Sequence, residues 1–318
     1  SETGELFQNI LMLQILQHVL PPAAMGPVVA LIGLELAGSA AETGCIIGSG
    51  VTRGTVITFL VTLAVAVFGS VLFRGFFSTI PILISIICGY IAGVITKVIK
   101  PQTIVDALHT SFISIPNFQT PKFDINAILI ILPVILVIAN EHIGHQLVTS
   151  KVIGRDLLKD PGLHRSLFAD NFSTMISGFI GSVPTTTYGE NIGVMAITKV
   201  YSVRVIGGAA VLSIICSFVG PLAALIQTIP GPVIGGISFL LYGMIGTSGL
   251  RILVDNKVDY SKNRNMILTS VIFVTGLSGV TLSLGDVSLS GMTLAAIVGM
   301  IMSLIFYVLD KAKLTNDA

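Results

Sequence analysis

Long runs of apolar residues constrain this chain more than any other feature of its sequence. A helix needs about 20 apolar residues to cross a hydrocarbon core of about 30 Å. Such runs occupy about 20–43, 54–73, 77–98, 126–149, 168–183, 201–227, 230–249, 265–282 and 288–309, with a short run at 190–199. The sequence therefore predicts an all-α polytopic membrane protein with ten membrane segments, one of them half length. Residues 10–19 are a candidate interfacial helix.

The composition agrees with a membrane protein and gives no sign of a cofactor. Hydrophobic residues make up 53% of the 318 residues and charged residues 10%, whereas a soluble domain carries about 25% charged residues. The formal net charge of +1 gives no reason to expect a nucleic-acid partner. Cys45, Cys88 and Cys216 lie within or beside apolar runs, at spacings that match no metal or disulfide pattern. We therefore expect packing cysteines, no metal site and no cofactor.

The positive charges between the segments set the orientation of the chain. If the ten segments alternate in direction, one side of the membrane receives Arg53, Lys97, Lys100 and Lys122. The other side receives the larger set: Arg74, Lys151, Arg155, Lys159, Arg165, Lys199, Arg204, Arg251, Lys257, Lys262, Arg264, Lys311 and Lys313. Cytoplasmic loops carry an excess of Lys and Arg. This distribution predicts cytoplasmic loops at 150–167 and 250–264, and it supports the short run 190–199 as a real segment.

The chain also contains a repeat. The sequence PPAAMGPVVALIG from Pro21 aligns with PGPVIGGISFLLY from Pro230, at an offset of 209 residues. Seven segments separate the two starts, and an odd number inverts the second copy. Inverted repeats are typical of secondary transporters, whose binding sites lie near the midplane at discontinuous helices. The counterparts of 126–228 would lie before residue 1, so we expect ten segments of a fourteen-segment fold.

Glu141 and His145 lie four residues apart within an apolar run, in the sequence VIANEHIGHQLV. Residues at this spacing are neighbours on one helical face, and ionisable side chains within membrane spans are functional candidates by default. A carboxylate beside an imidazole can share a proton, because His titrates near physiological pH. The alternative is that the two side chains only satisfy each other. His142 points about 100° away from Glu141, so we expect a structural or interfacial role for it.

The stretch VPTTTYGENIGVMAITK, residues 183–199, interrupts the apolar pattern. The β-branched residues Thr185–Thr187 follow Pro184 and favour an extended backbone, and Gly189 allows another group to approach the main chain closely. A helix that starts near Glu190 presents unpaired N–H groups and the positive end of its dipole. Its ten residues span about 15 Å, half of the hydrocarbon core. Carboxylate and N–H donors would therefore meet near mid-membrane and suit a planar ligand; the alternative is that Glu190 only caps the helix.

Two further residues have less certain roles in the sequence. Glu35, in IGLELAGS, lies towards the end of its span, which favours a structural or interfacial role. Tyr188 can stack on a ligand, donate a hydrogen bond to Glu141, or serve in packing alone. The sequence leaves these alternatives open.

Two motifs identify a resemblance to a known family. Glu190-Asn191-Ile192-Gly193, followed by Thr198-Lys199, resembles the signature of the nucleobase–ascorbate transporters, or nucleobase–cation symporters of the second class. That signature is Gln, Glu or Pro, then Asn-x-Gly-x4-Thr, then Lys, Arg or Gly. The stretch NEHIGH, residues 140–145, is similar to a second family motif. The segment from Gly162 to Ser202 looks very like the bacterial uracil permeases of this family, and the likeness runs from about Pro21 to the C-terminus.

The resemblance implies a fold of two inverted sevens, with half-helices and short strands, in which a core domain moves against a gate domain. By this likeness residues 1–125 hold the first part of the gate, 126–228 the second half of the core, and 229–318 the second part of the gate with the C-terminal tail. The other half-helix, with its substrate contacts, is expected before residue 1.

The resemblance also implies the roles of single residues. Glu141 and Glu190 bind the nucleobase, Gly189 offers main-chain hydrogen bonds, and Tyr188 lies beside them. His145 takes part in proton coupling with Glu141. The signature residues are Asn191, Gly193 and Thr198.

The function implied by the family is transport rather than catalysis: proton-coupled uracil import (uracil:H⁺ symport) across a bacterial plasma membrane by alternating access. Glu at position 190 fits the uracil branch, because purine members often carry Gln there. The alternatives are a xanthine or urate permease, an anion transporter of the same architecture, and a transport-inactive fragment; two carboxylates argue against anions. The implied partners are uracil or a related nucleobase, protons and the lipid bilayer, and a homodimer is one assembly that the sequence leaves open.

Overall fold

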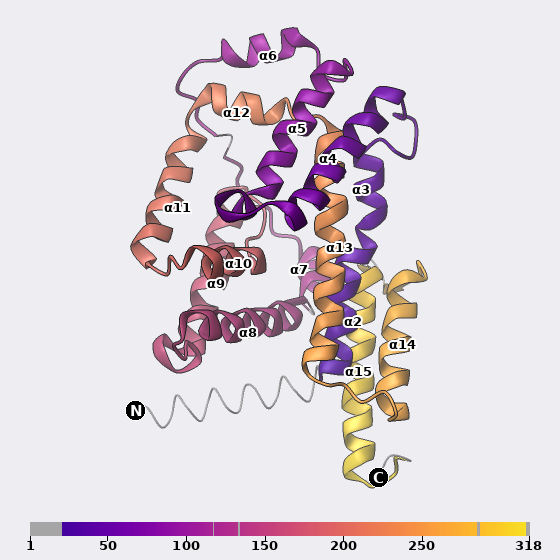
Figure 1. The fold of residues 1–318 in the computed structure, drawn as a ribbon. Coiled ribbons are helices and arrows are strands. Elements are labelled where there is room, and N and C mark those ends of the chain that lie inside the picture. Colours follow the sequence, from indigo (N-terminus) through magenta and orange to yellow (C-terminus); the bar gives the residue numbers. More distant parts are fainter. Residues whose placement is uncertain (1–20, 117, 133, 285–286, 316–318) are drawn as a thin grey trace. The chain divides into compact units, whose positions relative to one another are not determined.

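The computed structural model describes residues 21–116, 118–132, 134–284 and 287–315, and most of them lie in helices (Figure 1). Four helical stretches within these residues are long and apolar enough to cross a membrane: Pro22–Thr43, Arg53–Leu72, Gly231–Asp255 and Gly291–Lys311. The predicted helical, polytopic architecture is confirmed at this level, whereas the inverted repeat stays a prediction. The candidate interfacial helix at 10–19 lies outside the described residues.

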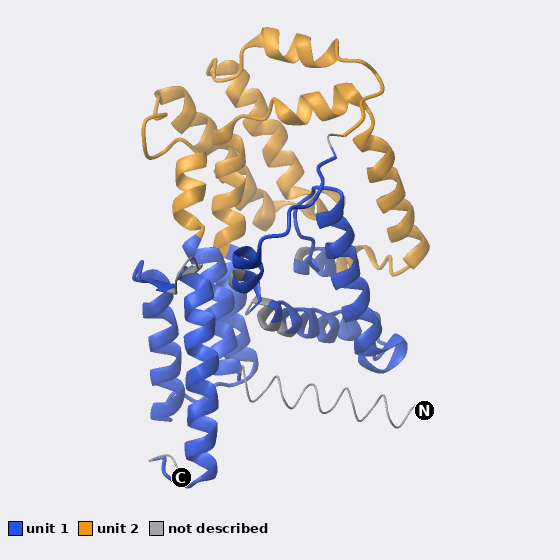
Figure 2. Ribbon diagram, turned by 180° about the vertical axis from the view of Figure 1, so that it is seen from behind, with its two compact units in different colours: residues 1–35, 118–193, 244–318 blue, residues 36–117, 194–243 orange. Residues whose placement is uncertain are grey.

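The chain divides into two compact units, each assembled from separate stretches of sequence (Figure 2). Unit 1 comprises residues 1–35, 118–193 and 244–318, and unit 2 comprises residues 36–117 and 194–243. Each unit therefore combines stretches that lie far apart in the sequence. The division into core and gate domains, with boundaries at 125/126 and 228/229, remains a prediction from the family likeness.

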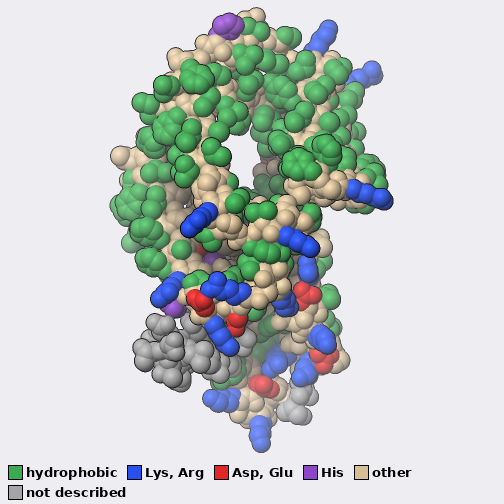
Figure 3. Space-filling view, turned by 60° about the vertical axis from the view of Figure 1, so that its left-hand side comes forward, with side chains coloured by type: hydrophobic (Ala, Val, Ile, Leu, Met, Phe, Trp, Pro, Cys, Tyr) green, Lys and Arg blue, Asp and Glu red, His purple; other side chains and the backbone are tan. Residues whose placement is uncertain are grey.

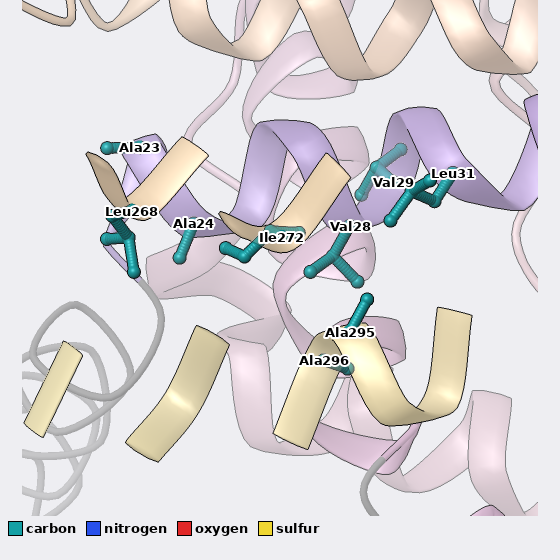
Figure 4. Close-up of a cluster of buried hydrophobic side chains, with 9 residues drawn as sticks. All are labelled: Ala23, Ala24, Val28, Val29, Leu31, Leu268, Ile272, Ala295 and Ala296. Carbon is teal, nitrogen blue, oxygen red and sulfur yellow. The ribbon is translucent and has the colours of Figure 1, made fainter. Parts of the chain in front are cut away.

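Three helices of unit 1 pack around an apolar cluster (Figure 4). They are α2 (Pro22–Glu35), α14 (Asn263–Leu277) and α15 (Gly291–Lys311). The cluster consists of Ala23, Ala24, Val28, Val29, Leu31, Leu268, Ile272, Ala295 and Ala296. Small residues let these helices approach closely: a Cβ atom at Gly299 would lie 2.8 Å from Ile272 Cδ1. Close packing of uncharged side chains therefore stabilises the cluster.

The middle of the chain contributes a second group of helices to unit 1. They are α7 (Ile125–Ile131), α8 (Val134–Ile153), the short π-helix η2 (Leu158–Gly162), α9 (Leu163–Phe179) and the first half of α10 (Gly189–Thr198). Asp124 caps α7, because its carboxylate accepts hydrogen bonds from the backbone N–H groups of the first turn. Ile143, Leu163 and Leu167 form a small buried cluster where α8 meets α9. This cluster packs α8, which carries Glu141 and His145, against α9.

Unit 2 contains α3 (Ala37–Thr43), α4 (Arg53–Leu72), the 3₁₀ turn η1 (Gly75–Thr79), α5 (Pro81–Ile95), α6 (Pro101–Leu108), α11 (Val203–Ser217), α12 (Gly220–Gln227) and the start of α13 (Gly231–Asp255). Helices α4 and α5 pack closely because Gly89 lies against Thr62. The buried hydroxyl of Thr62 donates to the carbonyl of Thr58 at 2.7 Å, and Thr58 Oγ1 lies 2.9 Å from Thr96 Oγ1. Hydroxyl groups are thus satisfied locally inside an apolar helix pair.

The predicted span 201–227 is wrong in one respect, since it forms two helices instead of one. Helix α11 ends at Ser217 and α12 begins at Gly220, with Pro221 in its first turn. The backbone N–H of Gly220 donates to the carbonyl of Phe112 at 2.9 Å. A proline has no N–H to continue a helix from before it, so the Gly-Pro pair was the signal for this break.

Three other boundaries also differ from the prediction. The predicted loop 99–125 contains helix α6, and α9 begins at Leu163 rather than at residue 168. Between α14 and α15 the chain forms an antiparallel hairpin of β1 (Thr281–Leu284) and β2 (Val287–Ser290). These differences arise because Pro101 starts a helix in a polar stretch, and because a polar first turn of α9 hides its start from a search for apolar runs.

Much of the described surface is hydrophobic, as the face in Figure 3 shows. Helix α11 has no buried residue, and its Val203 and Leu212 are 82% and 62% exposed. Val71 at the end of α4 and Val274 on α14 are 77% and 67% exposed. Soluble monomers rarely expose contiguous apolar patches of this kind. The surface therefore fits an apolar solvent such as a lipid bilayer.

Candidate functional site

The candidate residues of the sequence lie on two elements of unit 1. Glu141 and His145 lie on α8, and Gly189 and Glu190 lie where α10 begins. A segment without helix or strand, residues 182–188, connects α9 to α10, and we call it the extended segment after the backbone that the sequence predicts for it. Helix α10 runs from Gly189 to Thr198 and has ten residues, which confirms the predicted half-length helix and its start.

Hydroxyl groups of α9 hold the extended segment in place. Ser177 Oγ donates to the carbonyl of Val183 at 2.5 Å, and Thr174 Oγ1 donates to the carbonyl of Thr185 at 2.6 Å. Ser173 Oγ lies 2.9 Å from Thr185 Oγ1. A backbone carbonyl in lipid must find a partner within the protein, and here α9 supplies it. Among the described residues this segment belongs to no helix or strand, and its extended backbone stays a prediction.

His145 joins the same segment to α8. Its Nδ1 lies 3.0 Å from Thr187 Oγ1, and a Cβ atom at Gly189 would lie 2.9 Å from its Nε2. Real Cβ contacts are essentially never this short, so only glycine fits at position 189 without a shift of the ring. We call these contacts, from Ser173, Thr174 and Ser177 on α9 to His145 on α8, the hydroxyl network.

Glu141 lies one turn before His145 on α8, and its side chain is half-buried. Two residues at this spacing are about 6 Å apart along the helix axis, and the His145 ring contacts the segment that leads into α10. The backbone of Glu190 belongs to the first turn of α10. Its side chain lies outside what the structure describes.

The start of α10 has the properties that the sequence predicted for it. The first four N–H groups of a helix have no partner within the helix, and the dipole adds partial positive charge there. Tyr188, just before the helix, is 67% exposed. Groups that accept, donate and stack therefore lie within a few residues of each other. The binding roles of Glu141, Glu190, Gly189 and Tyr188 stay predictions.

The signature residues after Glu190 differ in their surroundings. Asn191 is exposed and Ile192 is buried. A Cβ atom at Gly193 would meet no described atom within 4 Å. Thr198 Oγ1 donates to the carbonyl of Val194 at 2.8 Å and so closes the last turn of α10. The signature thus includes both ends of the half-length helix.

The sequence analysis missed one ionisable residue, Asp170. It lies in the middle of α9 and within ion-pair distance of His142: His142 Nδ1 lies 3.6 Å from Asp170 Oδ2. His142 Nε2 lies 2.9 Å from Ser166 Oγ, and only 2% of the His142 side chain is exposed. Asp170 escaped notice because the apolar run was assigned to start at 168, which made the residue look terminal.

Glu35 has the structural contact that the sequence favoured. Its Oε2 accepts a hydrogen bond from the backbone N–H of Met292 at 2.7 Å. Met292 belongs to the first turn of α15, so the carboxylate satisfies one of the unpaired N–H groups there. Glu35 therefore joins the end of α2 to the start of α15.

The described residues contain no group of three or more His, Cys, Asp or Glu side chains that could hold a metal ion. Cys45, Cys88 and Cys216 are free thiols, and Cys216 is exposed.

Comparison with known proteins agrees with this architecture. The family described as "Permease family" matches residues 5–285. A protein named "Uracil permease" from Escherichia coli (strain K12) is 54% identical over 301 residues, which are 94% of this chain and 70% of that protein. Proteins of the same name are 49% identical in Paenibacillus larvae, over 95% of this chain and 72% of the relative, and 45% identical in Bacillus subtilis (strain 168), over 94% and 70%.

These matches define the class of protein as a multi-pass membrane permease. The chain belongs to the permease family, and the resemblance to nucleobase transporters that its two motifs indicated is confirmed.

Proposed function

We propose that this protein imports uracil across the bacterial plasma membrane. The observation that carries the proposal is the identity of 45–54% to several proteins named "Uracil permease", over more than nine-tenths of the chain. The helical, lipid-suited surface and the half-length helix α10 support a transporter rather than an enzyme.

The site supports recognition of a planar ring with both N–H and C=O groups. The carboxylates of Glu141 and Glu190 accept hydrogen bonds from the ring N–H groups, and charge-assisted bonds of this kind are roughly twice as strong as neutral ones. The backbone at Gly189 and the first turn of α10 offer N–H donors to the ring carbonyls. The exposed ring of Tyr188 is available to stack on the ligand. Glu at position 190 favours uracil over purines.

The proposed transport is driven by protons. His145 shares a helical face with Glu141, and an imidazole beside a carboxylate can tune the protonation of that carboxylate. The contact of His145 with Thr187 and Gly189 links its protonation to the segment that leads into α10. Uracil and a proton then cross together by alternating access, in which a core domain moves against a gate domain.

Uptake of labelled uracil into proteoliposomes tests this proposal. A pH gradient that is acidic outside should drive accumulation, and unlabelled uracil should compete whereas xanthine should not. Glu42→Gln, at an exposed carboxylate of α3, is the control and should transport normally. Competition by xanthine as strong as that by uracil would reassign the substrate to purines, and uptake that ignores the gradient would remove the proton from the mechanism.

A further inference from the structure

A second pair of ionisable side chains lies behind the candidate site, where α8 packs on α9. His142 follows Glu141 directly but faces α9, and its side chain is 2% exposed. Asp170 on α9 is 12% exposed. Buried ionisable groups in membrane spans are costly and rare, and the proposed uracil site uses neither of them.

The hydroxyl of Ser166 lies between the carbonyl of Leu163 and the ring of His142. A serine hydroxyl has one proton to donate, and Ser166 Oγ donates it to the carbonyl of Leu163 at 3.1 Å. The same oxygen lies 2.9 Å from His142 Nε2. If the hydroxyl proton stays with Leu163, this oxygen can only accept, and Nε2 carries the ring proton. A neutral imidazole has a single N–H, so in the neutral ring Nδ1 would bear a lone pair.

That lone pair would face the carboxylate of Asp170. Nδ1 of His142 is buried and has no hydrogen-bond partner in the described part of the chain, and Asp170 Oδ2 lies 3.6 Å away. A lone pair and an ionised carboxylate repel each other, and an uncompensated buried charge is expensive. One additional proton removes both problems. It either binds Nδ1 and makes an imidazolium–carboxylate pair, or binds Asp170 and makes a neutral carboxylic acid.

Other charged groups lie on the elements that pack against α8. They are Glu141, His145 and Lys151 on α8 itself, His164 and Arg165 on α9, Lys159 and Asp160 on η2, Glu35 on α2, and Asp310 and Lys311 on α15. Among the described side chains, Asp170 is the one that forms an ion pair with His142 within 4.0 Å. The protonation of His142 and Asp170 therefore depends first on the contact between these two residues.

We propose that His142 and Asp170 together hold one proton and form a proton-binding site separate from Glu141, Glu190 and His145. The consequence for transport rests on the proposed function. Loss of this proton leaves an unpaired negative charge between α8 and α9, which loosens their contact. Glu141 is the next residue of α8, and α9 also holds the extended segment through Thr174 and Ser177. His142 and Asp170 are thus positioning residues whose proton adjusts the nucleobase site.

Nitrogen-15 NMR of histidine-labelled wild-type protein in nanodiscs tests the proton count directly. The His142 signal, assigned by its loss in His142→Gln, should show an imidazolium. A neutral ring protonated at Nε2, with an infrared carboxylic-acid band that Asp170→Asn removes, would equally support the pair. A neutral ring protonated at Nδ1 beside an ionised Asp170, with Ser166 donating to Nε2, would overturn the proposal.

The pH dependence of uracil binding tests the consequence. Asp170→Asn and His142→Gln should each lose one titration step from the plot of Kd against pH. The control Ser270→Ala, which removes a hydroxyl bonded within α14, should keep every step. Wild-type steps in both variants would overturn the positioning role. Wild-type protein that binds no uracil at any pH would instead overturn the proposed function, and the NMR measurement would still decide the proton count.

Discussion

Two regions of unit 1 are stabilised by different interactions: one by apolar packing and the other by hydrogen bonds. The apolar cluster of α2, α14 and α15 consists of alanine, valine, leucine and isoleucine side chains and contains no ionisable group. The hydroxyl network of α8, α9 and the extended segment uses serine, threonine and histidine side chains to satisfy backbone carbonyls and one another. Both regions belong to the same compact unit.

The difference shows where function can be built in a membrane protein. Lipid tails are as apolar as leucine, so the apolar cluster depends on van der Waals packing between close helices. Such packing is indifferent to pH and to polar ligands. The hydroxyl network depends on directional contacts, and single protons or atoms can change it. We therefore propose that ligand and proton chemistry takes place at the network, and that the apolar cluster is a structural support.

The largest expected effect is on stability, in the apolar cluster. Leu31 is completely buried, and Leu31→Ala should lower the free energy of unfolding by about 2–5 kcal/mol, because it leaves a cavity. Uracil affinity of the folded protein should stay within about twofold, since each tenfold change needs 1.4 kcal/mol at the site. Denaturant unfolding in detergent and equilibrium binding measure the two quantities. Leu304→Ala, on the exposed face of α15, is the control and should lose much less unfolding free energy. Equal losses of unfolding free energy in the two variants would show that burial in the apolar cluster does not determine stability.

The next effect is on binding, at the start of α10. Glu190→Gln should weaken uracil binding roughly 100-fold, or about 2.7 kcal/mol, because an amide replaces a carboxylate acceptor only in part. Its unfolding free energy should change little. Binding by titration calorimetry, compared with Glu42→Gln, measures the effect. Wild-type affinity in Glu190→Gln would place this carboxylate outside the site.

A smaller effect is expected where the network meets α10. Gly189→Ala places a methyl group 2.9 Å from His145 Nε2, so the ring must move, and uracil binding should weaken about tenfold (about 1.4 kcal/mol). A Cβ atom at Gly178 on α9 meets nothing within 4 Å, so Gly178→Ala is the matched control. The two variants should differ in Kd, and equal Kd values would show that the His145 contact does not shape the site.

Sequence reasoning reached the chain's helical architecture because apolar length and loop charge report directly on membrane spans. It also found the extended segment and the start of α10, because Pro184, the threonines and Gly189 are local signals. It missed the break at Gly220 by treating an apolar run as one helix, although Pro221 marks it. It missed Asp170 because pairing with His142 depends on how α8 and α9 pack, and no local pattern encodes that contact.

The smallest effect tests a single bond of the hydroxyl network. Thr174 Oγ1 donates to the carbonyl of Thr185 at 2.6 Å, and Thr174→Val leaves that carbonyl without this donor. We expect a loss of about 1 kcal/mol in unfolding free energy, with faster hydrogen exchange confined to the extended segment. Thr149→Val, whose hydroxyl bonds only within its own helix turn, should show neither change. Uniform exchange across α9 and the segment would mean that the network is not a local support.

Equilibrium binding of labelled uracil to the purified protein tests the central claim most directly, which is that α8 and α10 form a uracil site through Glu141 and Glu190. The account predicts saturable binding that unlabelled uracil displaces and xanthine does not, and that the double variant Glu141→Gln/Glu190→Gln abolishes. Saturable binding of equal affinity in the double variant would contradict the claim, because the ligand would then be recognised elsewhere in the molecule.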